Sequence, residues 1–306
     1  MRIVLFGECM LEHSDSGEFR FGGDTLNTAL YLSRMLPAGK VQVRYATALG
    51  IDQDSDALLA TWQQEGLDTS LVLRLTDKVP GRYRIHLQPD GQRRFEYWRD
   101  DSAARYYLRD GNNPLLSVLE NQDCDYFYLS GISLAILTPH HRQLLLDAMA
   151  RFCQQGGKVI FDNNYRPVLW QQNPLPWYQK VMQLAYLVLL TDEDEYALYG
   201  DDDPEAILAR CQTWGIPYVL IKRGNQPCLV RTRRELTQVS AQKVIKVVDT
   251  SAAGDSFAGG FLAAWLCGQP ADVAAQNGHA LAAHVIQHPG AIIPRSAMLD
   301  LMPIKE

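Results

Sequence analysis

The sequence has few of the features that mark secreted, metal-binding or membrane proteins. Its six cysteines include no Cys-x-x-Cys pair, which favours reduced thiols in a cytoplasmic protein. We expect no zinc site, because His140 and His141 are neighbours at a helix start and His284 and His288 flank a turn. No apolar run is long enough to span a bilayer, and residues 1–8 are typical of a first strand rather than a secretory signal.

Several enzyme signatures are also absent. The chain has neither G-x-x-x-x-G-K-[ST] nor G-x-G-x-x-G, so a nucleotide would have to be held without a P-loop or a dinucleotide fingerprint. The missing G-x-S-x-G argues against a hydrolase. A net charge of −6 at pH 7 argues against nucleic acid and against a polybasic contact with a membrane.

The 306 residues do contain a regular alternation of strand-like and helix-like segments, which implies an α/β fold. We expect a doubly wound, mostly parallel sheet with helices on both faces. The predicted strands are 3–6, 41–49, 71–75, 125–129, 158–161, 186–190 and 218–221, with a hairpin at 228–231 and 236–239. The predicted helices are 25–36, 54–65, 139–155, 176–184, 204–213 and 271–286, and an acidic helix start is expected at 191–195. No repeat or linker interrupts the pattern, so we expect one domain over residues 1–306.

A pair of aromatic and basic runs differs from the rest of the chain. Residues 82–87 and 93–98 flank Gln88-Pro89-Asp90-Gly91, and Asp-Gly between strand-like runs predicts a hairpin. Because these runs are not purely aliphatic, they favour a sheet with one face open to solvent or to a ligand. Residues 11–21 are polar and mixed, which predicts a loop or short exposed strands.

The most specific stretch runs from Val247 to Phe261. A β-branched run predicts a strand that ends at Asp249, a turn of small residues follows, and an apolar helix is expected over 257–267. Small residues let backbone N–H groups approach a ligand, and a helix N-terminus favours an anion such as phosphate. Asp255 falls in the first turn, where the helix dipole predicts an ionised carboxylate. A role as helix stabiliser alone would suit an isolated Gly-Asp, but not so narrow a pattern.

Polar residues and glycines follow the carboxyl ends of the predicted strands. Open α/β sheets bind their ligands at these ends. The segments concerned are 7–8, 130–131, 162–166, 191–195, 222–224 and 252–255. The chain thus carries its polar groups where a site is expected.

Two segments resemble the signatures of a known family. The Gly22-Gly23 pair with Asn27, and the stretch from Asp249 to Asp255, are similar to the two signatures of the ribokinase-like (PfkB) carbohydrate kinases. The resemblance runs from residue 3 to about residue 295. It implies a ribokinase-like fold with a small β lid, formed by segments near 10–21 and 80–99. It also implies ATP and Mg²⁺ as cofactors and leaves a monovalent cation open.

The resemblance implies roles for the matching residues. Asp255 would accept the proton of the attacking sugar hydroxyl, and the backbone N–H groups of Ala252, Ala253 and Gly254 would bind the transferred phosphoryl group. The residues matched to the nucleotide are Asn164, Lys222, Arg223, Gly224, Gly254 and Asn277.

The position linked to magnesium departs from the family pattern. Thr191 and Asp194 stand where the family has Asn-x-x-Glu, and both residue types differ. We expect Asp194 or Glu195 to reach the metal through water, because magnesium takes few protein carboxylates when phosphates and water complete its shell.

The resemblance also implies a set of residues on the substrate side. They are Gly23, Asn27, Tyr83, Tyr97, Arg99, Arg166 and Asp255. Two arginines that converge on one ligand suit a carboxylate, because a guanidinium matches it in a bidentate fork. The expected substrate is therefore a sugar acid, and the resemblance implies 2-keto-3-deoxy-D-gluconate, phosphorylated to its 6-phosphate. For Arg99, a surface pair with Asp100 or Asp101 is the alternative.

Two other functions stay open at this point. A kinase of a neutral sugar, such as a fructokinase or ribokinase, would not need the arginine pair. A non-catalytic sugar- or nucleotide-binding regulator would not need Asp255. The hairpin is further expected to close over the sugar, to exclude water and to form a dimer contact. The expected partners are a small sugar acid, ATP and a second copy of the chain.

Overall fold

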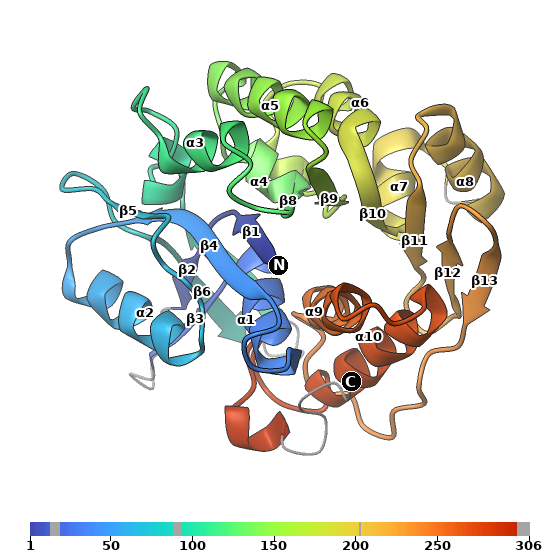
Figure 1. Cartoon of the computed structure of the whole chain (residues 1–306). Coiled ribbons are helices and arrows are strands. Elements are labelled where there is room, and N and C mark those ends of the chain that lie inside the picture. Colours follow the sequence, from blue (N-terminus) through green and yellow to red (C-terminus); the bar gives the residue numbers. More distant parts are fainter. Residues whose placement is uncertain (13–18, 88–92, 202, 299–306) are drawn as a thin grey trace.

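The computed structural model describes residues 1–12, 19–87, 93–201 and 203–298, and these residues form two sheets (Figure 1). The larger sheet has the order β13-β12-β11-β10-β9-β8-β1-β4-β5. Its strands are β1 (Arg2–Phe6), β4 (Gln42–Leu49), β5 (Val72–Arg74), β8 (Tyr126–Ser130), β9 (Lys158–Asp162), β10 (Ala185–Thr191), β11 (Tyr218–Lys222), β12 (Cys228–Arg231) and β13 (Leu236–Val239).

The larger sheet is parallel from β5 to β11, and β12 and β13 add antiparallel pairs at one edge. The strand order reverses at β1, with β4 and β5 on one side and β8 to β11 on the other. In open α/β sheets, ligands bind beyond the carboxyl ends of the strands at such a reversal. The topology therefore predicts a ligand site among the residues that follow β1, β8, β9, β10 and β11.

Helices cover both faces of the larger sheet, which confirms the predicted doubly wound α/β fold. They are α1 (Asp24–Met35), α2 (Gln53–Gln64), α3 (Pro114–Glu120), α4 (Gly131–Ala135), α5 (Pro139–Gln154), α6 (Leu175–Leu184), α7 (Asp192–Tyr199), α8 (Pro204–Thr213), α9 (Ala253–Leu266) and α10 (Ala271–Val285). Short 3-10 turns lie at Ala103–Tyr106, Pro167–Leu169 and Arg295–Met298. In Figure 1, α1, α2, α9 and α10 lie on one face and the helices from the middle of the chain on the other. None of the helices described here is both long and apolar enough to cross a membrane.

Alternate residues of the central strands point to opposite faces of the sheet and pack into two apolar cores. In β1, Ile3 and Leu5 face the core beneath α1, α9 and α10, whereas Val4 and Phe6 face the core beneath the helices of the other face. This is the two-residue period of a strand that is buried on both faces.

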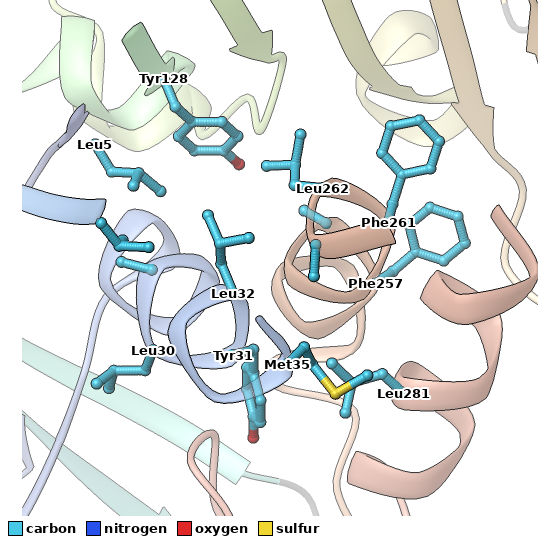
Figure 2. Close-up of a cluster of buried hydrophobic side chains, with 14 of the residues drawn as sticks. Leu5, Leu30, Tyr31, Leu32, Met35, Tyr128, Phe257, Phe261, Leu262 and Leu281 are labelled. Carbon is cyan, nitrogen blue, oxygen red and sulfur yellow. The ribbon is translucent and has the colours of Figure 1, made fainter. Parts of the chain in front are cut away.

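The packing of α9 against α1 fixes the position of the site. Gly259 lies so close to α1 that a Cβ added there would be 2.6 Å from the Cβ of Tyr31. Figure 2 shows Leu32 and Met35 of α1 on the side that faces Leu262 of α9 and Leu281 of α10. Because interiors pack at crystal-like density, this close contact holds the first turn of α9 in register with the first turn of α1.

The smaller sheet has the order β3-β2-β6-β7. Its strands are β2 (Met10–Glu12), β3 (Arg20–Gly22), β6 (Gly81–Leu87) and β7 (Arg93–Trp98). Strand β6 pairs antiparallel with β7 and parallel with β2, so segments far apart in the sequence form one sheet. We refer to this sheet as the lid. The expected turn at Gln88-Pro89-Asp90-Gly91 lies outside the described residues.

The predicted strand ending at Asp249 is wrong. Val247 and Val248 are exposed in a loop, and the N–H of Val248 donates to the carbonyl of Ile286 at 2.8 Å. A strand needs a sheet edge to pair with as well as β-branched residues, and residues 247–248 belong to neither sheet. The helix that follows begins at Ala253, four residues before the predicted start.

Two short helices were not predicted. Helix α3 has Asn113 as its N-cap and Pro114 in its first turn, and α4 has a capping box made by Ser130 and Ser133. Both helices are shorter than the window over which helical periodicity is visible. Their caps are the only local signal, and helix α4 follows β8 directly.

Candidate active site

A cleft of about 950 Å³ lies beyond the carboxyl ends of β10 and β11. One side is formed by residues 191–193 and 222–225, and the other by the loop that precedes α9 and by His279, Ala282 and Ile286 of α10. A pocket of this volume, lined by apolar and polar side chains, suits a ligand of nucleotide size. Lys222, Arg223 and Gly224, which were matched to the nucleotide, all line this cleft.

The predicted anion cradle lies at one end of the cleft. Ala253 and Gly254 line the cleft at the N-terminus of α9, where the first N–H groups have no partner within the helix. The N–H of Ala253 donates to Thr250 O at 3.1 Å. The Nζ of Lys222 lies 3.5 Å from the position that a Cβ would take on Gly254. A helix N-terminus and an ammonium group thus meet at one point, and both favour a phosphate there.

Asp255 lies in the first turn of α9 and contacts the sugar-side signature. Its Oδ2 accepts a hydrogen bond of 2.8 Å from Nδ2 of Asn27, and its backbone carbonyl accepts one of 3.3 Å from Thr28. The sequence predicts an ionised carboxylate at Asp255, because the helix dipole favours the charged form. Burial raises the pKa of Asp255 to about 7, and the charge of Asp24 adds to the effect. Loss of hydration therefore outweighs the helix dipole.

Two further carboxylates surround Asp255, and neither was assigned a role from the sequence. Asp24, in the first turn of α1, accepts a hydrogen bond of 2.7 Å from Nδ2 of Asn164, and burial raises its pKa. Asp162, the last residue of β9, pairs with Lys222 at 2.9 Å. Asp162 directly follows the predicted strand 158–161, so the strand-end rule pointed to it, whereas Asp24 is marked only by its place directly after the Gly22-Gly23 pair.

The sugar-side signature contains a position that only glycine can fill. A Cβ on Gly23 would lie 2.1 Å from the carbonyl oxygen of Glu8. The next turn carries Asn27, whose Oδ1 is buried with no hydrogen-bond donor among the described residues. The lid also reaches Asn27. A Cβ added to Gly22 of the lid would lie 3.6 Å from Asn27 Oδ1 and 3.9 Å from the hydroxyl of Tyr83. The structure therefore brings Gly23, Asn27 and Tyr83 together.

The substrate-side candidates in the lid and directly after it, Tyr83, Tyr97 and Arg99, contact other protein side chains. Tyr83 donates to Glu12 at 2.9 Å, and its ring centre is 6.2 Å from that of Tyr97, whose residue is 50% exposed. Arg99 donates to Glu8 in a buried ion pair, so the alternative pairing with Asp100 or Asp101 is wrong.

Arg166 lies near the carboxyl end of β10. Its Nη1 is 3.4 Å from Oδ1 of Asp194, and its side chain is 52% exposed. The two arginines expected to converge therefore have different protein partners in this structure.

The candidates for the magnesium side differ from one another. Asp194 is held at the start of α7, where Thr191 caps the helix, and burial raises its pKa. Glu195 is fully buried and pairs with Arg210 at 2.7 Å, while Asn163 donates to its other oxygen at 3.2 Å. Both carboxylate oxygens of Glu195 thus accept hydrogen bonds from protein side chains. Asp194 is therefore the better candidate for the magnesium side.

Two of the residues matched to the nucleotide do not line the cleft. Asn164 contacts Asp24 instead, and the side chain of Asn277 donates to Val273 O at 2.9 Å within α10. The residue of α10 that faces the cleft with a polar group is His279, whose ring lies 3.1 Å from Val239 O. Residues 279, 282 and 286 share one face of the helix, whereas 277 points about half a turn away.

The donor set fits a hydrated magnesium ion. Among the residues that the structure describes, no group of three or more His, Cys, Asp or Glu side chains is placed to hold a metal directly. Asp162 nevertheless ends β9, and Asp194 lies in the first turn of α7, directly after the adjacent strand β10. Oxygen ligands of this kind bind Mg²⁺ together with phosphates and water.

The doubly wound sheet, the cleft beyond its carboxyl ends and the second, smaller sheet agree with the expected ribokinase-like fold. Comparison with known proteins agrees: the family model described as pfkB family carbohydrate kinase matches residues 4–298. The chain therefore belongs to the pfkB family of carbohydrate kinases.

Individual relatives cover nearly the whole chain. The 2-dehydro-3-deoxygluconokinase of Dickeya dadantii is 46% identical, and that of Escherichia coli K12 is 44% identical; each comparison covers 97% of this chain and 98% of the relative. Among solved structures, an E. coli protein in complex with ATP and Mg²⁺ is 20% identical and has a TM-score of 0.81, with 98% of each chain covered. At that identity, the structural likeness shows the fold alone.

Proposed function

We propose that this chain transfers the γ-phosphoryl group of ATP to 2-keto-3-deoxy-D-gluconate and forms the 6-phosphate. The names of the relatives at 44–46% identity support this substrate. The observation that carries the proposal is the position of Asp255. It follows Gly254, which lines the nucleotide-sized cleft, and it is hydrogen-bonded to Asn27 of the sugar-side signature. A carboxylate at this junction can contact the acceptor hydroxyl while the cradle holds the phosphate.

In the proposed mechanism, Asp255 removes the proton of the 6-hydroxyl as its oxygen attacks the γ-phosphorus and the bond to ADP breaks. A pKa of about 7 suits a base that has to be deprotonated before the reaction and protonated after it. The backbone of residues 252–254 and the ammonium of Lys222 stabilise the charge on the transferred group. Asn27 orients the carboxylate through its amide, and its unsatisfied Oδ1 is available to a sugar hydroxyl.

Magnesium, when bound, neutralises charge on the phosphates. Asp194 and Asp162 would hold its water shell, and the E. coli structure with ATP and Mg²⁺ supports this pair of cofactors for the fold.

The preference for a sugar acid rests on the two arginines. Arg99 keeps an Nε–H that is buried and has no acceptor among the described residues. Arg166 is half exposed beside the expected crevice, and its contact with Asp194 is long. Buried donors without acceptors are costly, so a ligand carboxylate that satisfies them gains affinity.

Sugar-dependent release of ADP tests the function. We expect release with 2-keto-3-deoxygluconate and little with fructose or ribose. Asp255→Asn should lower kcat by about 10²–10⁴-fold and leave ATP binding intact, because loss of a general base removes only proton transfer. Asp272→Asn, which changes an acidic residue in the first turn of α10, is the matched control. Sugar-dependent turnover by Asp255→Asn at the parental rate would exclude Asp255 as the base.

Substrate choice is tested by Arg166→Ala. We expect KM for the sugar acid to rise at least tenfold, because a charge-assisted hydrogen bond is lost, while the weak turnover of fructose changes little. Arg151→Ala, which removes a surface arginine paired with Glu120, serves as control. An equal loss with acid and neutral sugars would instead favour a neutral-sugar kinase.

We also propose that the lid pairs two copies of the chain. Strand β7 is an edge of the lid in the described part of the chain, and Tyr97 and Trp98 are each 50% exposed. Trp98→Asp should convert a dimer to a monomer in sedimentation velocity. Leu236→Asp, at an exposed apolar position on the edge strand β13, should have no such effect. A monomeric parent protein would exclude the dimer.

A further inference from the structure

Three segments meet at the carboxylate of Glu8, directly after β1. Oε2 accepts a hydrogen bond from Arg99 at the end of β7, and Oε1 accepts one from the hydroxyl of Ser102. The first residue of β6, Gly81, packs against the same group, because a Cβ there would lie 3.0 Å from Oε1 and 3.3 Å from the Cβ of Arg99. Both ends of the lid hairpin are thus fastened to the end of the central strand.

The ion pair between Glu8 and Arg99 is buried. The side chain of Glu8 is 1% exposed and that of Arg99 is 10% exposed. The backbone carbonyl of Glu8 also contacts Gly23, the start of the sugar-side signature. The pair therefore lies where the lid, the central sheet and the sugar-side residues come together.

In the described part of the chain, Arg99 has a buried donor that no protein group uses. A guanidinium has five N–H donors, and Glu8 accepts from Nη2, while Nε has no acceptor among the described residues. A long side chain held at one edge by a buried carboxylate loses less rotamer freedom when a second carboxylate binds its other edge. Glu8 is not itself a group that a sugar acid would contact by charge, since two carboxylates repel.

We propose that Glu8 is a positioning residue that fixes the guanidinium of Arg99 for the carboxylate of the substrate and so sets the preference for a sugar acid. This inference rests on the proposed function. It differs from a purely structural role, in which Glu8 only anchors the lid. A lid anchor would affect acid and neutral sugars alike, whereas a positioning residue for Arg99 affects only the ligand that has a carboxylate.

The test is the ratio of kcat/KM for 2-keto-3-deoxygluconate to kcat/KM for fructose in Glu8→Gln. Gln keeps the shape of Glu8 but loses the charge that orients Arg99. We expect the ratio to fall by about tenfold or more through KM for the sugar acid, with KM for ATP within about twofold of the parent, since one charge-assisted hydrogen bond is lost. In an Arg99→Ala background, Glu8→Gln should change the ratio no further.

The matched control is Glu65→Gln. It removes a second buried carboxylate–arginine pair, Glu65 with Arg34 at 2.6 Å, away from the lid. It should lower the thermal midpoint as Glu8→Gln does and leave the ratio unchanged. If Glu8→Gln does not fold, Glu8→Asp, which keeps the charge but is one carbon shorter, should show the same fall in the ratio.

Two results are distinguishable. A parent enzyme that phosphorylates the sugar acid, with an unchanged or increased ratio in Glu8→Gln or Glu8→Asp, overturns the inference alone. A parent enzyme that releases no ADP with the sugar acid overturns the proposed function and the inference with it.

Discussion

Asn27 and Asp255 are 228 residues apart in the sequence, and the hydrogen bond between them joins the N-terminal ends of α1 and α9. Each helix is placed by the apolar core between α1, α9 and α10, where Gly259 permits close contact with Tyr31. The proposed cradle, the sugar-side signature and the proposed base all depend on this contact. If the two helix ends moved apart by one ångström, Asp255 would no longer serve both sides.

Several carboxylates lie close together where the N-termini of α1 and α9 meet. Asp24, Asp162 and Asp255 share one buried region, and Lys222 is paired with Asp162. Burial and the charge of Asp24 raise the pKa of Asp255 to about 7, against an ordinary value of 3.8. The contribution of Asp255 to stability therefore falls as the pH rises from about 4 to about 7, because the unfolded chain releases this proton first. In the proposed mechanism, this cost in stability is offset by a base of useful strength.

Much of the fold could be predicted from the sequence because its strands and long helices carry clear periodicity. The hairpin at 228–231 and 236–239 is an example, since both strands begin and end where predicted. The strand predicted at Val247 and Val248 shows the limit: propensity is visible in the sequence, but the edge that a strand must pair with is not. Asp255 and Lys222 could be found because they belong to short motifs. The partnership of Arg99 with Glu8, and the raised pKa of Asp255, depend on burial and on residues that are distant in sequence.

The most direct test of this account is the pH dependence of kcat/KM for the sugar acid at saturating ATP and magnesium. The base must be deprotonated, so the account predicts that kcat/KM falls about tenfold per pH unit below a break near pH 7 and is level above it. Asp24→Asn should move the break to lower pH, because it removes the neighbouring negative charge; ionisation of ATP itself would not respond to this change. A profile that stays flat down to about pH 5, or a break that Asp24→Asn leaves in place, would contradict the assignment of Asp255 as a base tuned by burial and by its neighbours.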